Sequence, residues 1–153
     1  LIGGAAGDTI AGNLGNDLLL GDEGTVTLEG GIVKTAVSTN VATGGADSIT
    51  GDEGNDTIIG GAYNDTLNGN AGNDLISLGG GNDLILIDLG TDTVTDIGQG
   101  TDTVQVSQSA TLNGTVTASW TATAQSRNDG VANLATSGFN VNLEAVSSGN
   151  GWR

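Results

Sequence analysis

The feature that most constrains this chain is a nine-residue period. From Gly51 to Leu86 the sequence reads GDEGNDTII GGAYNDTLN GNAGNDLIS LGGGNDLIL, which is four consecutive units in strict register. Each unit is rich in glycine at its start, with Asp at the sixth place and an aliphatic residue at the eighth. Nine residues are too few to bury a core alone, so the pattern predicts copies that stack on one another.

The period continues in both directions. Upstream copies cover residues 3–11, 12–20, 21–29, 30–38 and 42–50, and downstream copies cover 87–95 and 97–105. With the four central copies this makes eleven, interrupted by residues 39–41 and by the extra Asp96. Nine copies have the sixth-place carboxylate, at Asp8, Asp17, Asp47, Asp56, Asp65, Asp74, Asp83, Asp92 and Asp102. The copies at 21–29 and 30–38 have Val26 and Thr35 there instead.

A single unit predicts a turn followed by a short strand. Glycine and the fifth-place asparagines tolerate positive φ, and the last three residues, such as Thr57 to Ile59, favour a strand. Stacked strands lie about 4.8 Å apart, so carboxylates two repeats apart come close enough to repel or to share a cation. Turns that are merely solvated are the alternative interpretation.

Composition narrows the possible partners. The chain has 28 glycines, no proline and a net charge of −15 from 18 acidic and three basic residues. Such a chain does not attract nucleic acid or an anionic membrane surface by charge, and we expect neither nucleic-acid binding nor membrane insertion. The sequence has no His and no Cys, which excludes Ser-His and Cys-His catalysis and the usual zinc sites, so we expect no enzyme.

The units resemble the GGxGxDxUx calcium-binding nonapeptide of RTX (haemolysin-type) proteins, where U is aliphatic. This resemblance covers about two-thirds of the chain and implies an all-β fold, a parallel β-roll, over residues 1–105. It also implies several Ca²⁺ ions between turns that are two repeats apart. In the family, each ion takes oxygen ligands from two turns. The second, fourth and sixth places of one turn face the first, third and sixth places of the turn two repeats further on.

Applied to this chain, the family scheme gives five pairs of turns. Thr43, Gly45 and Asp47 face Gly60, Ala62 and Asp65; Asp52, Gly54 and Asp56 face Gly69, Ala71 and Asp74; Gly61, Tyr63 and Asp65 face Leu78, Gly80 and Asp83; Asn70, Gly72 and Asp74 face Ile87, Leu89 and Asp92; and Gly79, Gly81 and Asp83 face Ile97, Gln99 and Asp102. Asp96 lies inside the last pair.

Several acidic residues fall outside this scheme. Asp8 and Asp17 look forward to copies that lack the sixth-place Asp, so their forward sites are expected to be weak or empty. Asp22, Glu23, Asp52, Glu53 and Asp88 are expected to be solvated surface acids, except where a backbone carbonyl is the ligand. Leu1 and Ile2 read as the end of a further repeat, and we expect the chain to be a piece of a longer array.

Residues 106–153 have a different composition, with alternating Thr, Ser, Ala and Val. We expect strands at 115–123, 131–136 and 139–143, with Asp129-Gly130 as a hairpin turn. The prediction is a short antiparallel β unit that serves as a spacer or cap, with Trp120 and Phe139 as its small core or as a sugar platform. The segment resembles spacers between RTX blocks of large bacterial surface proteins.

Together these features favour a calcium-binding structural segment of a secreted bacterial cell-surface protein, of the S-layer or adhesin type. Its other partners would be copies of itself or neighbouring repeats. The alternative is a calcium-folded secretion module of an exported RTX enzyme or toxin, for which the resemblance implies type I secretion. An ice-binding face built on Thr91, Thr93, Thr95, Thr101 and Thr103 is a weaker possibility, because two rows are few.

Overall fold

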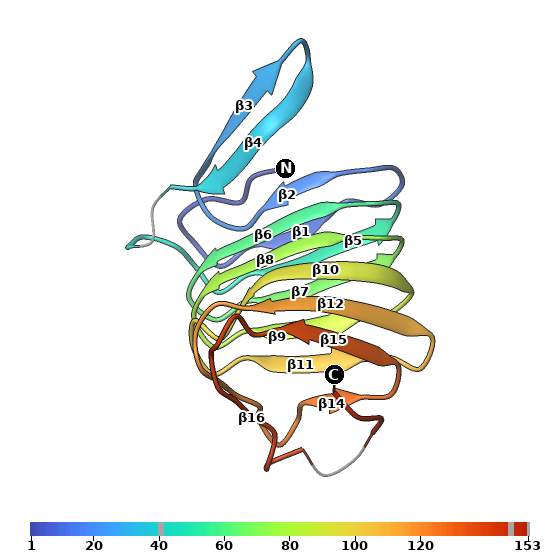
Figure 1. Ribbon diagram of the computed structural model, residues 1–153. Coiled ribbons are helices and arrows are strands. Elements are labelled where there is room, and N and C mark those ends of the chain that lie inside the picture. Colours follow the sequence, from blue (N-terminus) through green and yellow to red (C-terminus); the bar gives the residue numbers. More distant parts are fainter. Residues whose placement is uncertain (40–41, 147–148, 153) are drawn as a thin grey trace.

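The computed structural model describes residues 1–39, 42–146 and 149–152, and over these residues the chain is a β-solenoid of about five turns without helices (Figure 1). Two six-stranded parallel sheets face each other. The first sheet contains β1 (Thr9–Ala11), β5 (Ser48–Glu53), β7 (Thr66–Ala71), β9 (Leu84–Ile87), β11 (Thr103–Val106) and β14 (Arg127–Asn128). The second contains β2 (Leu18–Leu20), β6 (Thr57–Ala62), β8 (Leu75–Gly80), β10 (Gly90–Ile97), β12 (Ala110–Val116) and β15 (Val131–Ala135). The all-β, parallel β-roll prediction is confirmed.

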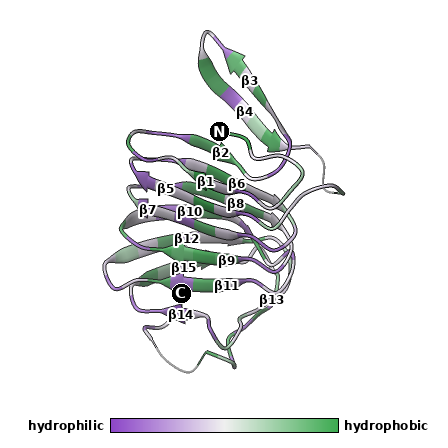
Figure 2. Cartoon of the chain, turned by 180° about the vertical axis from the view of Figure 1, so that it is seen from behind, coloured by the Kyte–Doolittle hydropathy of each residue, from purple (hydrophilic) through white to green (hydrophobic). Residues whose placement is uncertain are grey.

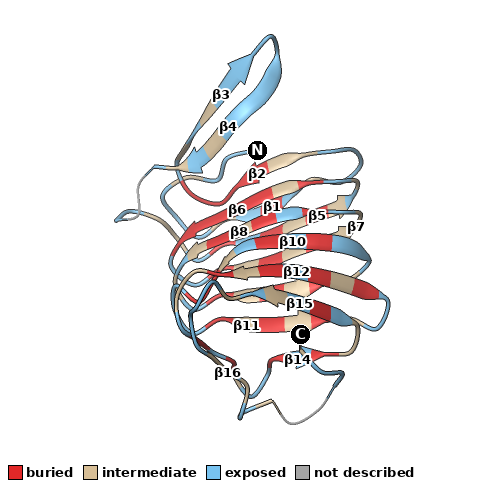
Figure 3. Cartoon of the chain, in the orientation of Figure 1, coloured by how far each residue is buried: buried red, intermediate tan, exposed pale blue. Residues whose placement is uncertain are grey.

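The eighth-place aliphatic residues form the core, as the period predicts. The chain alternates between the two sheets, so two nonapeptides make one coil. Eighth-place residues of successive coils therefore pair within one sheet: Ile49 pairs with Leu67, and Leu67 pairs with Ile85. Figure 3 shows buried segments along the strands of both sheets. The fully buried eighth-place residues are Ile49, Ile58, Leu67, Ile76, Ile85, Val94 and Val104. The stack therefore has one continuous apolar column, as solenoid repeats require.

The copies predicted at 21–29 and 30–38 are not coils, and this part of the prediction is wrong. They form β3 (Gly24–Glu29) and β4 (Ile32–Ser38), an antiparallel hairpin that projects from the roll (Figure 1) and that we call the arm, residues 24–38. The physical reason lies in the local sequence. TVTLE and IVKTAVS alternate with period two, and Gly30 and Gly31 both have positive φ in the turn between them.

The arm interrupts one nonapeptide between its second and third places. β1 pairs directly with β5, and Thr9 faces Ser48 across an interval much longer than one coil. The next interval is regular, because Ser48 faces Thr66, which lies only two nonapeptides further along the chain. The excess length of the first interval corresponds to residues 23–43, within which residues 40 and 41 lie outside the described part of the chain. Gly21 and Asp22 lie next to residues 44–50, although the arm separates them in the sequence. The two segments together form one complete nonapeptide, GDGGADSIT.

Glycine packing confirms this assembly. A Cβ on Gly21 would lie 2.2 Å from Asp47 Oδ2 and 2.5 Å from the Gly60 carbonyl oxygen. The first-place Gly51 of an uninterrupted unit has the same surroundings, with Asp56 Oδ2 at 2.2 Å and the Gly69 carbonyl at 2.8 Å. Gly21 therefore occupies the first place of the turn that ends at Asp47.

The roll continues past Val106, where we expected antiparallel strands. β11 pairs with β14, β12 pairs with β15, and β13 (Trp120–Thr121) pairs with β16 (Val141–Asn142), all in parallel. The Asp129-Gly130 turn joins β14 to β15, which belong to different sheets, so it is not a hairpin. A small antiparallel sheet exists, but it is the arm.

The physical reason for parallel pairing after Val106 is that the apolar column persists while the coils lengthen. Leu112, Val116 and Ala132 are buried in the same core. The coil that joins Val106 to its strand partner Asn128 is longer than two nonapeptides, yet it still returns the chain to the same sheet. Trp120 is in this core, as expected, whereas Phe139 is 42% exposed and is not.

Candidate metal-binding turns

Two ladders of carboxylates follow the two sides of the roll. Each ladder Asp lies just before a strand, except Asp92, which is the third residue of β10. The first ladder consists of Asp8, Asp47, Asp65, Asp83 and Asp102, and the second of Asp17, Asp56, Asp74 and Asp92. Except in the last member of each ladder, the backbone N–H of the Asp donates to Oδ1 of the Asp in the next coil, at distances from 2.7 to 3.2 Å. One oxygen of each accepting carboxylate is therefore used by the fold itself.

The second oxygen of these carboxylates is buried and has no hydrogen-bond partner. This holds for Oδ2 of Asp17, Asp47, Asp56, Asp65, Asp74, Asp83 and Asp92. A buried acceptor without a partner costs about 1–3 kcal/mol, and more when it is charged. The two described basic side chains, Lys34 and Arg127, are exposed and pair with Glu29 and Asp129, away from the ladders. The rows of Oδ2 atoms are therefore left for a cation from solution.

The pKa values express the same cost. The pKa of Asp65 is raised to about 7, mainly by burial of the carboxyl group. The hydrogen bond from the N–H of Asp47 lowers this pKa, whereas repulsion from Asp83 and other nearby carboxylates raises it. Burial likewise raises the pKa of Asp83 to about 7 and that of Asp92 to about 6. The pKa values of Asp47, Asp74 and Asp102 are raised for the same primary reason. Without a cation, these carboxyl groups favour the protonated form.

Backbone oxygens converge on the same Oδ2 atoms. A Cβ on Gly12 would lie 2.5 Å from the carbonyl of Gly51 and 2.9 Å from Asp17 Oδ2. The same pair of neighbours, a carbonyl oxygen from the next coil and Oδ2 of the Asp in the same nonapeptide, surrounds the first-place residues Gly3, Gly21, Gly51 and Gly60. Carboxylate and carbonyl oxygens are the ligands that Ca²⁺ takes, so this donor set fits that ion.

Positive φ angles open the turns. They occur at second places, such as Asp52 (72°) and Asn70 (64°), and at fourth places, such as Gly72 (150°). Fourth-place residues also stack in direct backbone contact, because a Cβ on Gly72 would lie 1.7 Å from the Gly54 carbonyl oxygen. At Gly72, a larger residue would have to displace the coil beneath it.

The structure brings all five predicted carboxylate pairs onto adjacent coils: Asp47 with Asp65, Asp56 with Asp74, Asp65 with Asp83, Asp74 with Asp92, and Asp83 with Asp102. The bulky first-place residues Leu78 and Ile87 fit because their side chains are buried in the core. The ligand roles of the other residues in the five pairs stay predictions. Asp96 causes no break in the ladder, because its carboxylate accepts from Leu78 N, Gly79 N and Ser77 Oγ.

Asp8 and Asp17 do not face copies without Asp. Because the arm leaves the roll, the N–H of Asp8 donates to Asp47 Oδ1 and that of Asp17 to Asp56 Oδ1, both at 2.7 Å. The expectation that their forward sites are weak rested on counting Val26 and Thr35 as turn residues, and that count is wrong. The structure thus has two further pairs that sequence reasoning missed.

Asp22 is the second correction. It is 1% exposed rather than a surface acid, and its carboxylate accepts from Gly45 N and Ala62 N at 2.9 and 2.6 Å. It occupies the second place predicted for Thr43, which is exposed. The signal was present in the sequence, since Gly21-Asp22 joined to residues 44–50 restores the period. Tyr63 is 51% exposed on its turn, as expected.

The fifth-place asparagines form ladders that sequence reasoning also missed. The Oδ1 of Asn16 accepts from Asn55 N, that of Asn55 from Asn73 N, and that of Asn73 from Thr91 N. On the other side, Asn64 accepts from Asn82 N, and Asn82 accepts from Thr101 N. These bonds run opposite to those of the Asp ladders, so each turn is tied to the coils before and after it.

Within the described ranges, no three His, Cys, Asp or Glu side chains cluster as an all-side-chain metal site would. Any cation between the coils therefore takes backbone carbonyls in addition to carboxylates. The model of the RTX calcium-binding nonapeptide repeat (4 copies) matches residues 1–31, 41–62 and 59–94, which is more than half of the chain. The chain belongs to this family.

The chain is thus a structural β-roll of RTX calcium-binding repeats. The second strand of the arm, β4, falls between two matched ranges, consistent with its departure from the repeat. No curated protein and no solved structure matches the chain. Among the residues that the structure describes, no helix has the length and apolar character needed to cross a membrane.

Proposed function

We propose that this RTX roll is a structural segment of a secreted bacterial cell-surface protein, and that it folds and becomes rigid when it binds extracellular calcium. The observation that carries the proposal is the row of buried Oδ2 atoms without partners. Neither basic side chain in the described part of the chain lies beside them, so the ionised carboxylates are neutralised only when cations bind between the coils.

We further propose seven calcium positions. Four lie between successive members of the first ladder, and three lie between successive members of the second. The sixth-place carboxylates would hold the ions, with carbonyls of first-place residues such as Gly51 and Gly60. The bound ion supplies positive charge where two carboxylates repel, and it joins one coil to the next.

Magnitudes support coupling of folding to extracellular calcium. With a Kd of about 10⁻⁴ M, typical of extracellular calcium modules, calcium at about ten times Kd stabilises each site by roughly 1.4 kcal/mol. Seven such sites give about 10 kcal/mol, which is comparable to the whole stability of a typical domain. At calcium far below Kd the same sites contribute almost nothing. The roll would then stay unfolded inside the cell and fold outside it.

The surface role is supported by the rod shape and by the continuation of the parallel stack into the Thr- and Ala-rich segment, through β12 and β15. A secretion module of an exported enzyme or toxin is the alternative role for the same calcium-binding roll. We also propose that the chain itself is not catalytic, because it has no His or Cys and its buried carboxylates belong to the ladders.

The test is a calcium titration from excess chelator, followed by far-UV circular dichroism and by calorimetry for the stoichiometry. We expect a cooperative gain of β-signal with a stoichiometry near seven. Asp65→Ala should weaken it, whereas Asp129→Ala, at an exposed acid paired with Arg127, should not. Full β-signal in chelator would show that the carboxylate ladders do not need calcium.

A further inference from the structure

The arm presents an apolar face to solvent. In the arm's register Val26 lies opposite Ala36 and Leu28 lies opposite Val33, and directly opposed residues share one face of a sheet. That face is therefore apolar apart from Ser38 at the base of the arm, while Thr25, Thr27, Thr35 and Val37 lie on the other. Leu28 is 60% exposed and Val33 is 47% exposed, and Figure 2 shows hydrophobic stretches along both strands. A two-stranded hairpin with such a face is marginal in water unless something covers it.

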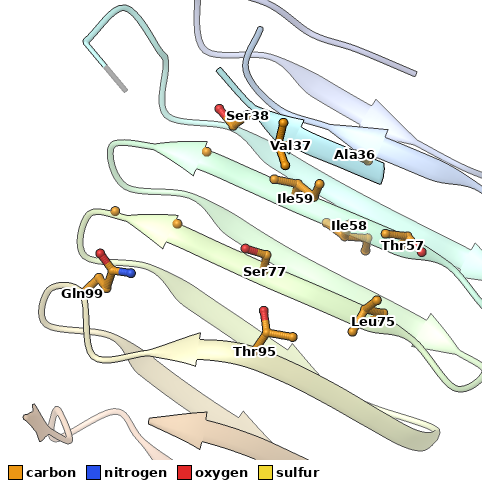
Figure 4. A pocket seen from close by; sticks show the side chains of 13 residues that line it. Ala36, Val37, Ser38, Thr57, Ile58, Ile59, Leu75, Ser77, Thr95 and Gln99 are labelled. Carbon is orange, nitrogen blue, oxygen red and sulfur yellow. The ribbon is translucent and has the colours of Figure 1, made fainter. Parts of the chain in front are cut away.

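A groove lies at the base of the arm. It has a volume of about 720 Å³ and lies between β4 and the outer face of β6, β8 and β10 (Figure 4). The arm contributes Ala36 and Val37, and the sheet contributes Ile59, Leu75 and Thr95. All lining residues are uncharged. Ala36 belongs to both the groove and the apolar face, so the two form one continuous surface.

Charge distinguishes this surface from the rest of the molecule. The chain carries a net charge of −15, whereas the only charged residues of the arm are Glu29 and Lys34, which pair with each other. Two copies of the chain repel through their acidic rolls. The arm is neutral and apolar and projects from the roll, so contact through it keeps the two acidic rolls apart and brings no like charges together.

We propose that the arm and its groove form a two-fold symmetric interface with a second copy of this chain. In a symmetric contact the same patch serves both copies, so two arms that cross in opposite directions place each tip at the partner's base. Leu28 and Val33 near each tip then enter the groove lined by Val37 and Ile59 in the other copy. The apolar face of one arm covers that of the other.

The size of the patch sets the strength of this contact. Six residue pairs give a face about 20 Å long and ~10 Å wide. Even with the groove, this is well below the ~800 Å² per partner of a stable complex, so the dimer is weak and forms at high local concentration.

The interface rests on the proposed calcium-dependent fold, because both ends of the arm enter one calcium-binding turn. Asp22 precedes the insertion and Gly44 follows it, and the Asp22 carboxylate accepts from the N–H of Gly45. Calcium in this turn fixes the base of the arm against the roll. The interface does not depend on a surface role for the parent protein.

The experiment is sedimentation equilibrium of the full chain in saturating calcium, from micromolar to millimolar protein. We expect a monomer–dimer equilibrium in the native chain. The double variant Leu28→Ser, Val33→Ser should dissociate at least tenfold more readily. Leu14→Ser is the matched control, because Leu14 is a 76% exposed apolar residue outside the arm, and it should dimerise like the native chain. Circular dichroism and calcium stoichiometry should be the same for all three.

A native chain that stays monomeric at millimolar concentration in calcium would overturn the proposal. So would a variant without residues 23–43 that still dimerises with native affinity, since another surface would then be responsible. The spectra separate this failure from failure of the calcium proposal, which would appear as a roll that is already folded in chelator.

Discussion

Removal of the arm gives a decisive test of how this roll is assembled. The structure places Gly21 and Asp22 in the same turn as residues 44–50, so deletion of residues 23–43 should join Asp22 to Gly44 and leave an uninterrupted nonapeptide. The alternative view, two degenerate coils at 21–29 and 30–38, makes the segment 21–38 the removable unit. The two deletions therefore have opposite expected effects.

The magnitudes follow from loop closure and from Asp22. Closing a turn through a 21-residue loop costs about 2.7 kcal/mol by the (3/2)RT ln n relation, and deletion of 23–43 removes that cost. Loss of the cover that Val37 gives Ile59 offsets part of it. Deletion of 21–38 instead removes Asp22, whose carboxylate accepts hydrogen bonds from Gly45 N and Ala62 N. At roughly 1.5–3 kcal/mol for each bond to a charged group, that variant should lose about 3–6 kcal/mol.

The assay is urea unfolding of both deletions and the native chain at saturating calcium, followed by circular dichroism. Deletion of 23–43 should leave the free energy of unfolding unchanged or raise it by up to about 2.7 kcal/mol, with the same calcium stoichiometry. Deletion of 21–38 should lower it and remove calcium from the turns beside Asp47. Equal or greater stability of the 21–38 deletion would refute the interrupted-repeat assembly.

Three further outcomes are expected. The Asp65→Asn variant should lose two calcium ions, because Asp65 lies between Asp47 and Asp83 and serves both sites. The Asp92→Asn variant, changed at a ladder end, should lose one. Calorimetry measures both losses, and equal losses would contradict the shared arrangement. Gly69→Ala should destabilise the calcium-bound roll by about 1–3 kcal/mol, because the new Cβ would lie 2.0 Å from Asp74 Oδ2. Gly80→Ala is the control and should be neutral, because its Cβ would meet nothing within 4 Å. Thermal unfolding measures both effects. In chelator, any residual roll should be most stable in acid: the raised pKa values of Asp65 and Asp83 (about 7) and Asp92 (about 6) mean that the fold binds protons more tightly than the unfolded chain does. That stability is fully present below about pH 4 and is lost as pH rises through about 7. Circular dichroism across this range would show no such loss if the carboxylates were solvated, because their pKa values would then be the same in the folded and unfolded chain.

Local chemistry made the roll predictable from the sequence. Turn glycines, Asp at every sixth place and Ile or Leu at every eighth repeat without a gap from Gly51 to Leu86, so each unit specifies the same turn, strand and core contact. The predicted carboxylate pairs, such as Asp56 with Asp74, follow from that count and lie on adjacent coils. The resemblance to the RTX nonapeptide implied calcium, and a set of oxygen donors without His or Cys is consistent with that ion.

Register across an interruption was not predictable in the same way. A count along the chain assigns residues 21–38 to the array because Gly21 and Gly30 recur at the interval of one nonapeptide, and it cannot tell a degenerate coil from an inserted hairpin. The partners of Asp8 and Asp17, and the burial of Asp22, depend on which strands pair after the arm has left the roll. That pairing joins Thr9 to Ser48 and Leu18 to Thr57, across the whole length of the insertion, so no local pattern reports it.

The C-terminal segment shows the same limit. Thr- and Ala-rich alternation from Thr115 indicates strands but not whether they pair in parallel, because period two is common to both arrangements. The path of the chain decided it: between β11 and β14, and again between β12 and β15, the chain passes through the other sheet and returns, so each new strand runs parallel to its partner. The sequence by itself therefore determined the repeat, its core and its calcium chemistry, which are properties of one nonapeptide at a time. Only the tertiary structure decided which turns face each other, where the arm leaves the roll and which carboxylates lose their solvent, because these depend on contacts between coils.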